Sequence, residues 1–69
     1  MEKAFIGENI KNIRKVANLS QAKFGSALGF SARTVSDWES GNTEPDITTI
    51  KKISKVFNVS YEDILDWLA

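Results

Sequence analysis

The chain has 69 residues, which is enough for one small domain and too few for two, so residues 1–69 are expected to form a single domain. It contains neither cysteine nor histidine, which excludes disulfides, thiolate metal sites and the commonest general base. The only remaining candidates for catalysis are scattered carboxylates and serines, so we expect no enzymatic activity, no cofactor and no metal ion. No segment has the pattern of a membrane span or a signal peptide, which favours a cytoplasmic protein.

The net charge is zero, but the charges are unevenly distributed along the chain. Residues 1–35 carry six basic and two acidic side chains, a balance of +4, whereas residues 36–69 carry three basic and seven acidic side chains, a balance of −4. This asymmetry is compatible with one face that meets a polyanion. It is equally compatible with two solvated halves, so charge alone does not decide between them.

Apolar residues recur at helical spacing in five segments, and no segment alternates as a strand does. The sequence therefore predicts an all-α fold. The expected apolar faces are Ile6, Ile10, Ile13 and Ala17 in the first helix, Phe24 and Leu28 in the second, Val35 and Trp38 in the third, Ile47, Ile50, Ile53 and Phe57 in the fourth, and Ile64 and Leu68 in the fifth.

Capping signals indicate where these helices begin and end. Ser20, Ser31 and Ser60 each follow an apolar residue and precede another apolar residue four places later, which is the pattern of an N-cap with a hydrophobic staple. Asp46 is expected to cap the fourth helix, whereas the first helix has no clear N-cap. The expected C-terminal caps, which tolerate the left-handed backbone conformation, are Gly29, Gly41 and Asn58.

The segment from Ser20 to Gly41, SQAKFGSALGFSARTVSDWESG, predicts a helix, a three-residue turn and a second helix. Gly29 supplies the sharp turn. Gly25 lies inside the first of these helices, where glycine costs about 1 kcal/mol relative to alanine, and a small residue there indicates a close approach of the next helix. An ordinary helical hairpin is the alternative. The turn length, the small residue and the paired staples together favour a helix-turn-helix over about residues 20–40.

These residues make the chain similar to the lambda repressor and Cro-type helix-turn-helix family, also called the Xre family. The matching pieces are Arg14 in the first helix, LSQAKFGSALGFS across the turn, Trp38-Glu39 with Gly41 at the end of the next helix, Pro45 before the fourth helix, and NVSYEDIL near the end of the chain. The resemblance covers nearly the whole chain. It implies a compact five-helix bundle, lambda repressor-like, which presents its third helix to the major groove of DNA.

The same resemblance implies a sequence-specific transcriptional regulator in the bacterial cytoplasm. The expected type is a repressor of a phage, a mobile element or a restriction–modification system. It would bind double-stranded DNA as a homodimer on a palindromic operator. A protein-interaction module or an antitoxin on the same scaffold is the alternative, which zero net charge favours slightly.

The resemblance also implies contacts with DNA phosphates around the motif, from Gln21 and from the loop at Asn42 and Thr43. Gln21 opens the second helix, where free N–H groups and the positive end of the helix dipole favour a phosphate. Asn42 and Thr43 follow the third helix, where small polar side chains and free N–H groups suit the same contact. The expected phosphate contacts are Gln21, Ser31, Lys23, Lys11, Asn42 and Thr43.

Base readout is expected from the outward face of the third helix, which contains Ala32, Arg33, Thr34, Ser36 and Asp37. Arg33 can make a bidentate contact with guanine or bind a phosphate, and Thr34 can contact a base edge or a thymine methyl group. Ala32 stands where some family members carry a base-reading glutamine and can offer only a methyl contact. Two interpretations of Asp37 stay open: it accepts from a cytosine amine, or it restrains Arg33 one helical turn earlier.

Two further pairs have structural or assembly roles. Arg14 and Glu39 match a family pair that forms a partly buried salt bridge between the first and third helices, although two independent surface charges are the alternative. Trp67 and Leu68 either complete the core or form a dimer contact. We favour the core for Leu68 and the dimer contact for Trp67.

Overall fold

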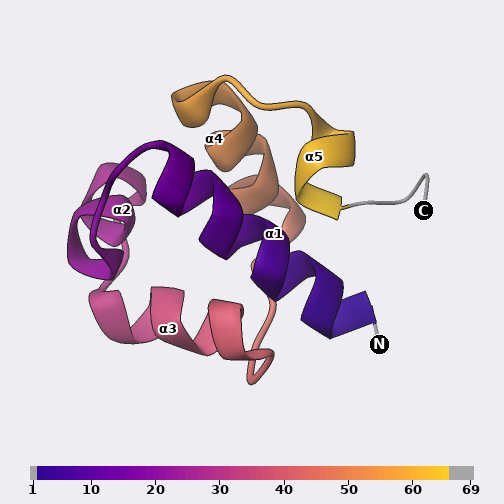
Figure 1. Ribbon diagram of the computed structural model, residues 1–69, viewed down its shortest axis with the longest axis horizontal. Coiled ribbons are helices and arrows are strands. Elements are labelled where there is room, and N and C mark those ends of the chain that lie inside the picture. Colours follow the sequence, from indigo (N-terminus) through magenta and orange to yellow (C-terminus); the bar gives the residue numbers. More distant parts are fainter. Residues whose placement is uncertain (1, 66–69) are drawn as a thin grey trace.

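The computed structural model describes the backbone of residues 2–65 and the side chains of residues 6–65. This part of the chain contains five helices and no strand: α1 (Glu2–Val16), α2 (Gln21–Leu28), α3 (Ala32–Ser40), α4 (Ile47–Phe57) and α5 (Tyr61–Leu65). Helix α1 runs across the molecule and packs against α3 on one side and α5 on the other, while α2 packs against α3 and α4 (Figure 1). The predicted all-α fold of five helices is confirmed. Within residues 2–65, no helix combines the length and the hydropathy that a membrane span requires.

The predicted N-caps fix the starts of four helices. Ser20, Ser31, Asp46 and Ser60 each use a side-chain oxygen to accept a hydrogen bond from the backbone N–H three residues later. At α5 the arrangement is reciprocal, because the backbone N–H of Ser60 also donates to the carboxylate of Asp63 at 3.4 Å. These local contacts set the boundaries of the helices before any tertiary packing is considered.

Residues in the left-handed backbone conformation end the helices. Gly29, Gly41 and Asn58 have φ values of 87°, 85° and 55°, as the sequence predicts. Asn18, with φ 61°, follows α1 in the same conformation, which the sequence did not predict. Because α1 ends at Val16, Ala17 lies exposed beyond the helix, so the prediction that Ala17 continues its buried face is wrong.

The core gathers residues from all five helices: Ile10, Ile13, Phe24, Leu28, Val35, Trp38, Ile50, Ile53 and Ile64 are buried. The rings of Phe24 and Phe57 stack at 4.6 Å and join α2 to the end of α4. The predicted core position Ile47 is wrong, because its side chain is 63% exposed. Ile47 is the first residue of α4. Two residues later, Thr49 is buried on the face of α4 that Ile47 was expected to share. Leu68 lies outside the described residues.

The N-cap of α4 makes one contribution to stability depend on pH. The pKa of Asp46 lies below its ordinary value because the side chain and the backbone N–H of Thr49 donate to the carboxylate. A lowered pKa stabilises the folded state above the unfolded-state pKa of about 3.9 and loses that stabilisation as the pH falls through the folded-state value. We expect Asp46→Asn, which keeps an acceptor but loses the charge, to unfold with a weaker acid dependence.

Urea unfolding of both proteins between pH 6 and pH 2.5 measures this difference. Glu62→Gln is the matched control, since Glu62 is an exposed acid on α5 whose side chain makes no described hydrogen bond. The expectation is contradicted if Asp46→Asn and wild type lose the same free energy of unfolding over this pH range.

Candidate nucleic-acid interface

The turn between α2 and α3 is built by backbone contacts that only a glycine permits. The backbone N–H of Phe30 donates to the carbonyl oxygen of Gly25 at 2.7 Å. A Cβ atom on Gly25 would lie 2.6 Å from the carbonyl oxygen of Phe30 and 3.0 Å from that of Ser31. The close approach that the sequence indicates is therefore present, and it fixes the angle at which α3 leaves the turn.

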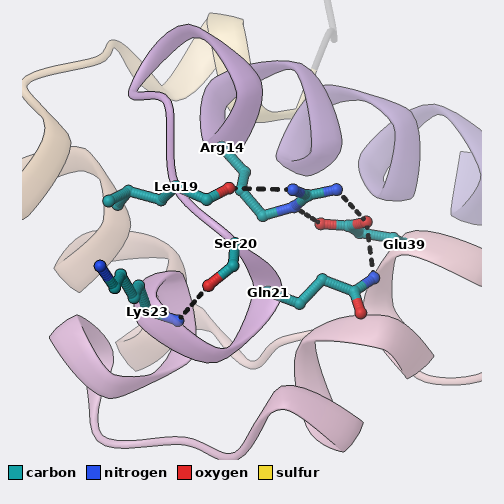
Figure 2. Close-up of polar contacts among 6 residues, drawn as sticks. All are labelled: Arg14, Leu19, Ser20, Gln21, Lys23 and Glu39. Atoms are coloured by element: carbon teal, nitrogen blue, oxygen red, sulfur yellow. Dashed lines mark hydrogen bonds and ion pairs between the residues drawn. The ribbon is translucent and has the colours of Figure 1, made fainter.

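An ion pair ties α3 to α1. Arg14 donates from Nε to Oε2 of Glu39 at 2.6 Å and from Nη2 to Oε1 at 3.1 Å, while its Nη1 donates to the carbonyl oxygen of Leu19 at 3.0 Å. The two side chains are 13% and 6% exposed. Figure 2 shows this bidentate pair between the two helices. The salt bridge expected between the first and third helices is thus present in the structure.

Hydrogen bonding to Glu39 raises the pKa of Arg14 above its ordinary value, although burial acts in the opposite direction. Arg14 is therefore a permanent cation that is held in a partly desolvated place by its partner. Such a pair is costly to break on one side, because the remaining charge stays buried without compensation. In the described part of the chain, every buried polar side-chain atom has a hydrogen-bond partner.

Gln21 joins the same network from the start of α2. Its Nε2 donates to Oε1 of Glu39 at 3.1 Å, so Glu39 links three helices at one point (Figure 2). A glutamine amide has two N–H donors, and this contact uses one of them. The second N–H makes no hydrogen bond among the described residues, whereas the backbone N–H of Lys23 in the first turn of α2 is already engaged by the Ser20 hydroxyl.

The five residues expected to read bases differ in exposure. Arg33 is 87% exposed and projects from α3, whereas Ala32, Thr34 and Ser36 are partly buried. Asp37 is 29% exposed, and its Oδ1 lies 3.8 Å from Nε of Arg33. The hydroxyl of Thr34 lies 3.1 Å from that of Ser31, so it is engaged at the cap of its own helix.

The loop after α3 differs from the expectation in one respect. The backbone N–H groups of Asn42 and Thr43 donate to the carbonyl oxygen of Asp37 at 3.0 and 3.3 Å, because they close the end of α3. The prediction that these N–H groups are free for a phosphate is therefore wrong. The side chains of both residues are exposed and keep that potential.

The sequence did not predict two features, one that positions α3 and one that caps α2. Gly7 of α1 is buried against the end of α3, where a Cβ atom would lie 2.5 Å from the carbonyl oxygen of Trp38. Lys52 of α4 donates to the carbonyl oxygen of Leu28 at 3.2 Å and so caps the end of α2. A glycine inside a predicted helix was the available signal for the first, whereas no local signal reveals the second.

The remaining predicted site residues are placed as follows. Lys11 on α1 and Lys23 on α2 are exposed. Trp67 lies outside the described residues, as Leu68 does.

Comparison with known proteins decides the family. Residues 10–64 match the family model described as helix-turn-helix. The chain belongs to this helix-turn-helix family. It is 40% identical over 60 residues to the antitoxin PezA of Streptococcus pneumoniae, a match that covers 87% of this chain and 38% of PezA. The chain thus spans well under half of the length of this curated relative.

Two solved structures share the fold. The c2 repressor of Salmonella phage P22, solved in complex with a synthetic operator, superimposes with a TM-score of 0.80 at 33% identity over 88% of this chain and 92% of that chain. Hydroxypropylphosphonic acid epoxidase from S. wedmorenis superimposes with a TM-score of 0.84 at 26% identity over 94% of this chain and 35% of that chain. The scaffold therefore occurs both in a DNA-bound repressor and as part of an enzyme.

Proposed function

We propose that this protein is a sequence-specific DNA-binding transcriptional regulator of the repressor type, which inserts α3 into the major groove. The observation that carries the proposal is the network at Glu39, which holds α3 against α1 and α2 while Arg33 projects outward. A reading helix must be held rigidly if its side chains are to meet base edges. The likeness to the operator-bound P22 c2 repressor supports the same conclusion.

The contacts with DNA divide into two groups in this proposal. Phosphates are bound by Gln21, Ser31, Lys23, Lys11 and the side chains of Asn42 and Thr43, which position the helix without reading sequence. Bases are read by the outward face of α3, namely Ala32, Arg33, Thr34, Ser36 and Asp37, with Arg33 as the principal reader because it is the most exposed.

We propose further that residues 1–69 act as one DNA-binding domain in the bacterial cytoplasm. Two copies would bind a palindromic operator, with half-sites about 10 bp apart so that the two reading helices enter successive major grooves. We assign no catalysis to the chain, because the likeness to the epoxidase covers 35% of that enzyme and the capping serines are engaged in structural contacts.

Salt dependence tests the proposed function. We expect the protein to bind duplex DNA with an affinity that falls steeply as salt rises, because each phosphate contact releases counterions. Fluorescence anisotropy on labelled duplexes between 50 and 200 mM salt, about the range over which such contacts are strongly weakened, measures it. A confirmed dimer that binds no duplex at low salt would contradict the proposal.

An antitoxin on the same scaffold is the second candidate, and the 40% identity to PezA favours it. An antitoxin must bind a protein partner with defined stoichiometry. Co-purification of one such partner, by a protein that shows no salt-dependent DNA binding, would support this function over the first.

Gln21 provides a test of phosphate contact separate from base readout. We expect Gln21→Ala to weaken binding to operator and unrelated duplexes by the same factor, about 1.5–3 kcal/mol for one lost hydrogen bond to a charged group. Titration of both duplexes measures it. Ser26→Ala is the matched control, because Ser26 is exposed on α2 and its side chain makes no described hydrogen bond. A change of sequence preference in Gln21→Ala would contradict the assigned role.

A further inference from the structure

Asp37 is an acidic side chain on a surface that we propose to face DNA, so its presence needs a physical reason. A carboxylate beside phosphates is repelled by them and lowers the affinity for any duplex. Asp37 nevertheless lies on α3, one helical turn after Arg33, with Oδ1 at 3.8 Å from Nε of that arginine. The two side chains form an ion pair on the reading face.

The surroundings of the pair make Asp37 the fixed partner and Arg33 the movable one. Oδ1 of Asp37 also lies 3.5 Å from Nδ2 of Asn42, and the backbone carbonyl of Asp37 accepts from Asn42 and Thr43. Asp37 is 29% exposed and held at the closed end of α3, whereas Arg33 is 87% exposed and makes no hydrogen bond among the described residues. Among the described residues, the carboxylate of Asp37 is thus the charged group that pairs with the guanidinium of Arg33 and restrains it.

The geometry of the pair leaves the reading edge of the arginine available. Nε of Arg33 faces the carboxylate, while a bidentate contact with O6 and N7 of guanine needs two parallel N–H donors, which the two Nη atoms supply. An arginine that is restrained in this direction loses less rotamer freedom on meeting guanine. It is also less able to swing to a neighbouring phosphate, where it would contribute affinity without sequence preference.

We propose that Asp37 is a specificity-determining residue that positions Arg33 for guanine and lowers the affinity for unrelated sequences. This inference rests on the proposed function. It accounts for an acid on the reading face, because the carboxylate lowers the affinity for every duplex by repelling phosphates, and only a duplex with guanine in reach of the restrained Arg33 recovers that loss. Discrimination by an unfavourable contact with wrong partners is a general route to specificity.

The test compares duplexes selected from a random pool by wild type, Asp37→Asn, Arg33→Ala and the double variant. We expect Asp37→Asn to bind unrelated duplexes about threefold more tightly, because one repulsive charge is lost. We also expect its ratio of operator to unrelated affinity to fall about fivefold or more, with guanine weakened at the base pair that Arg33→Ala also affects. In the Arg33→Ala background, Asp37→Asn should leave the preference at that base pair unchanged.

Glu62→Gln is the matched control, since it removes one exposed carboxylate from α5, which packs against α1 and α4. It should leave the affinity ratio unchanged. The inference is overturned if Asp37→Asn keeps the wild-type ratio, or if it alters a different base pair and does so equally without Arg33, which would make Asp37 a direct reader of cytosine. If wild type selects no sequence at all, the proposed function itself fails, and the inference falls with it.

Discussion

Glu39→Gln is expected to lower the free energy of unfolding by about 3 kcal/mol, because it leaves the partly buried guanidinium of Arg14 without its counter-charge. The size of the effect follows from burial: the two side chains are 13% and 6% exposed, and the carboxylate accepts from both Arg14 and Gln21. Glutamine keeps the volume of the side chain, so a cavity is not the cause. Urea unfolding at neutral pH measures the change.

The charge argument is separated from packing by a pair of further variants. Glu44→Gln is the matched control, since Glu44 is exposed in the loop before α4, and its free energy of unfolding should lie within about 0.5 kcal/mol of wild type. Arg14→Met combined with Glu39→Met should cost less than the sum of the two single changes, because no charge is then left unpaired. A Glu39→Gln protein as stable as the control would mean that the pair does not anchor α3.

Gly7→Ala is expected to destabilise the protein by about 2 kcal/mol, although alanine is the better helix former by about 1 kcal/mol. The new Cβ atom would lie 2.5 Å from the carbonyl oxygen of Trp38 and 2.8 Å from that of Glu39. Both neighbours are backbone atoms at the end of α3, so the contact can be relieved only by moving α1 away from α3. Thermal unfolding measures the sign and the size of the change.

The neighbouring exposed residue provides the control for Gly7→Ala. Glu8→Ala introduces the same side chain on the solvent side of α1 and should change the free energy of unfolding by less than about 0.5 kcal/mol. Because the shift acts on α3, Gly7→Ala should also weaken DNA binding at temperatures where the variant is fully folded. A stabilised Gly7→Ala protein, as helix propensity alone predicts, would refute the close helix crossing.

The features that the sequence predicts well are those with local causes. A serine or aspartate before an apolar stripe caps a helix through its own backbone, so the N-caps at Ser20, Ser31, Asp46 and Ser60 need no tertiary information. The pairing of Arg14 with Glu39 is not local, and it was expected only because both positions match the family. Spacing alone does not decide whether Arg14 and Glu39 form a salt bridge or are two separate surface charges. The family resemblance predicted the salt bridge.

The features that the sequence did not predict depend on contacts between distant elements. Ile47 fits the apolar stripe of α4 but lies beyond the surface that the other helices cover, so it is exposed. Lys52 caps α2 from another helix, and Gly7 matters only because α3 passes close to it. For the site, the i, i+4 spacing of Arg33 and Asp37 already allowed an ion pair, but it left open whether Asp37 contacts a base instead. The 3.8 Å between Asp37 Oδ1 and Arg33 Nε gives the pairing a geometric basis.

Selection of bound sequences from a random duplex pool, by wild type and by Arg33→Ala, tests most directly the claim that α3 reads DNA. We predict that wild type enriches a palindrome with half-sites about 10 bp apart. Each half-site should contain a guanine whose preference is lost in Arg33→Ala, at a cost of about 1–3 kcal/mol in operator affinity and none in folding. Enrichment of the same sequence by both proteins, with equal affinity, would contradict the assignment of α3 as the reading helix.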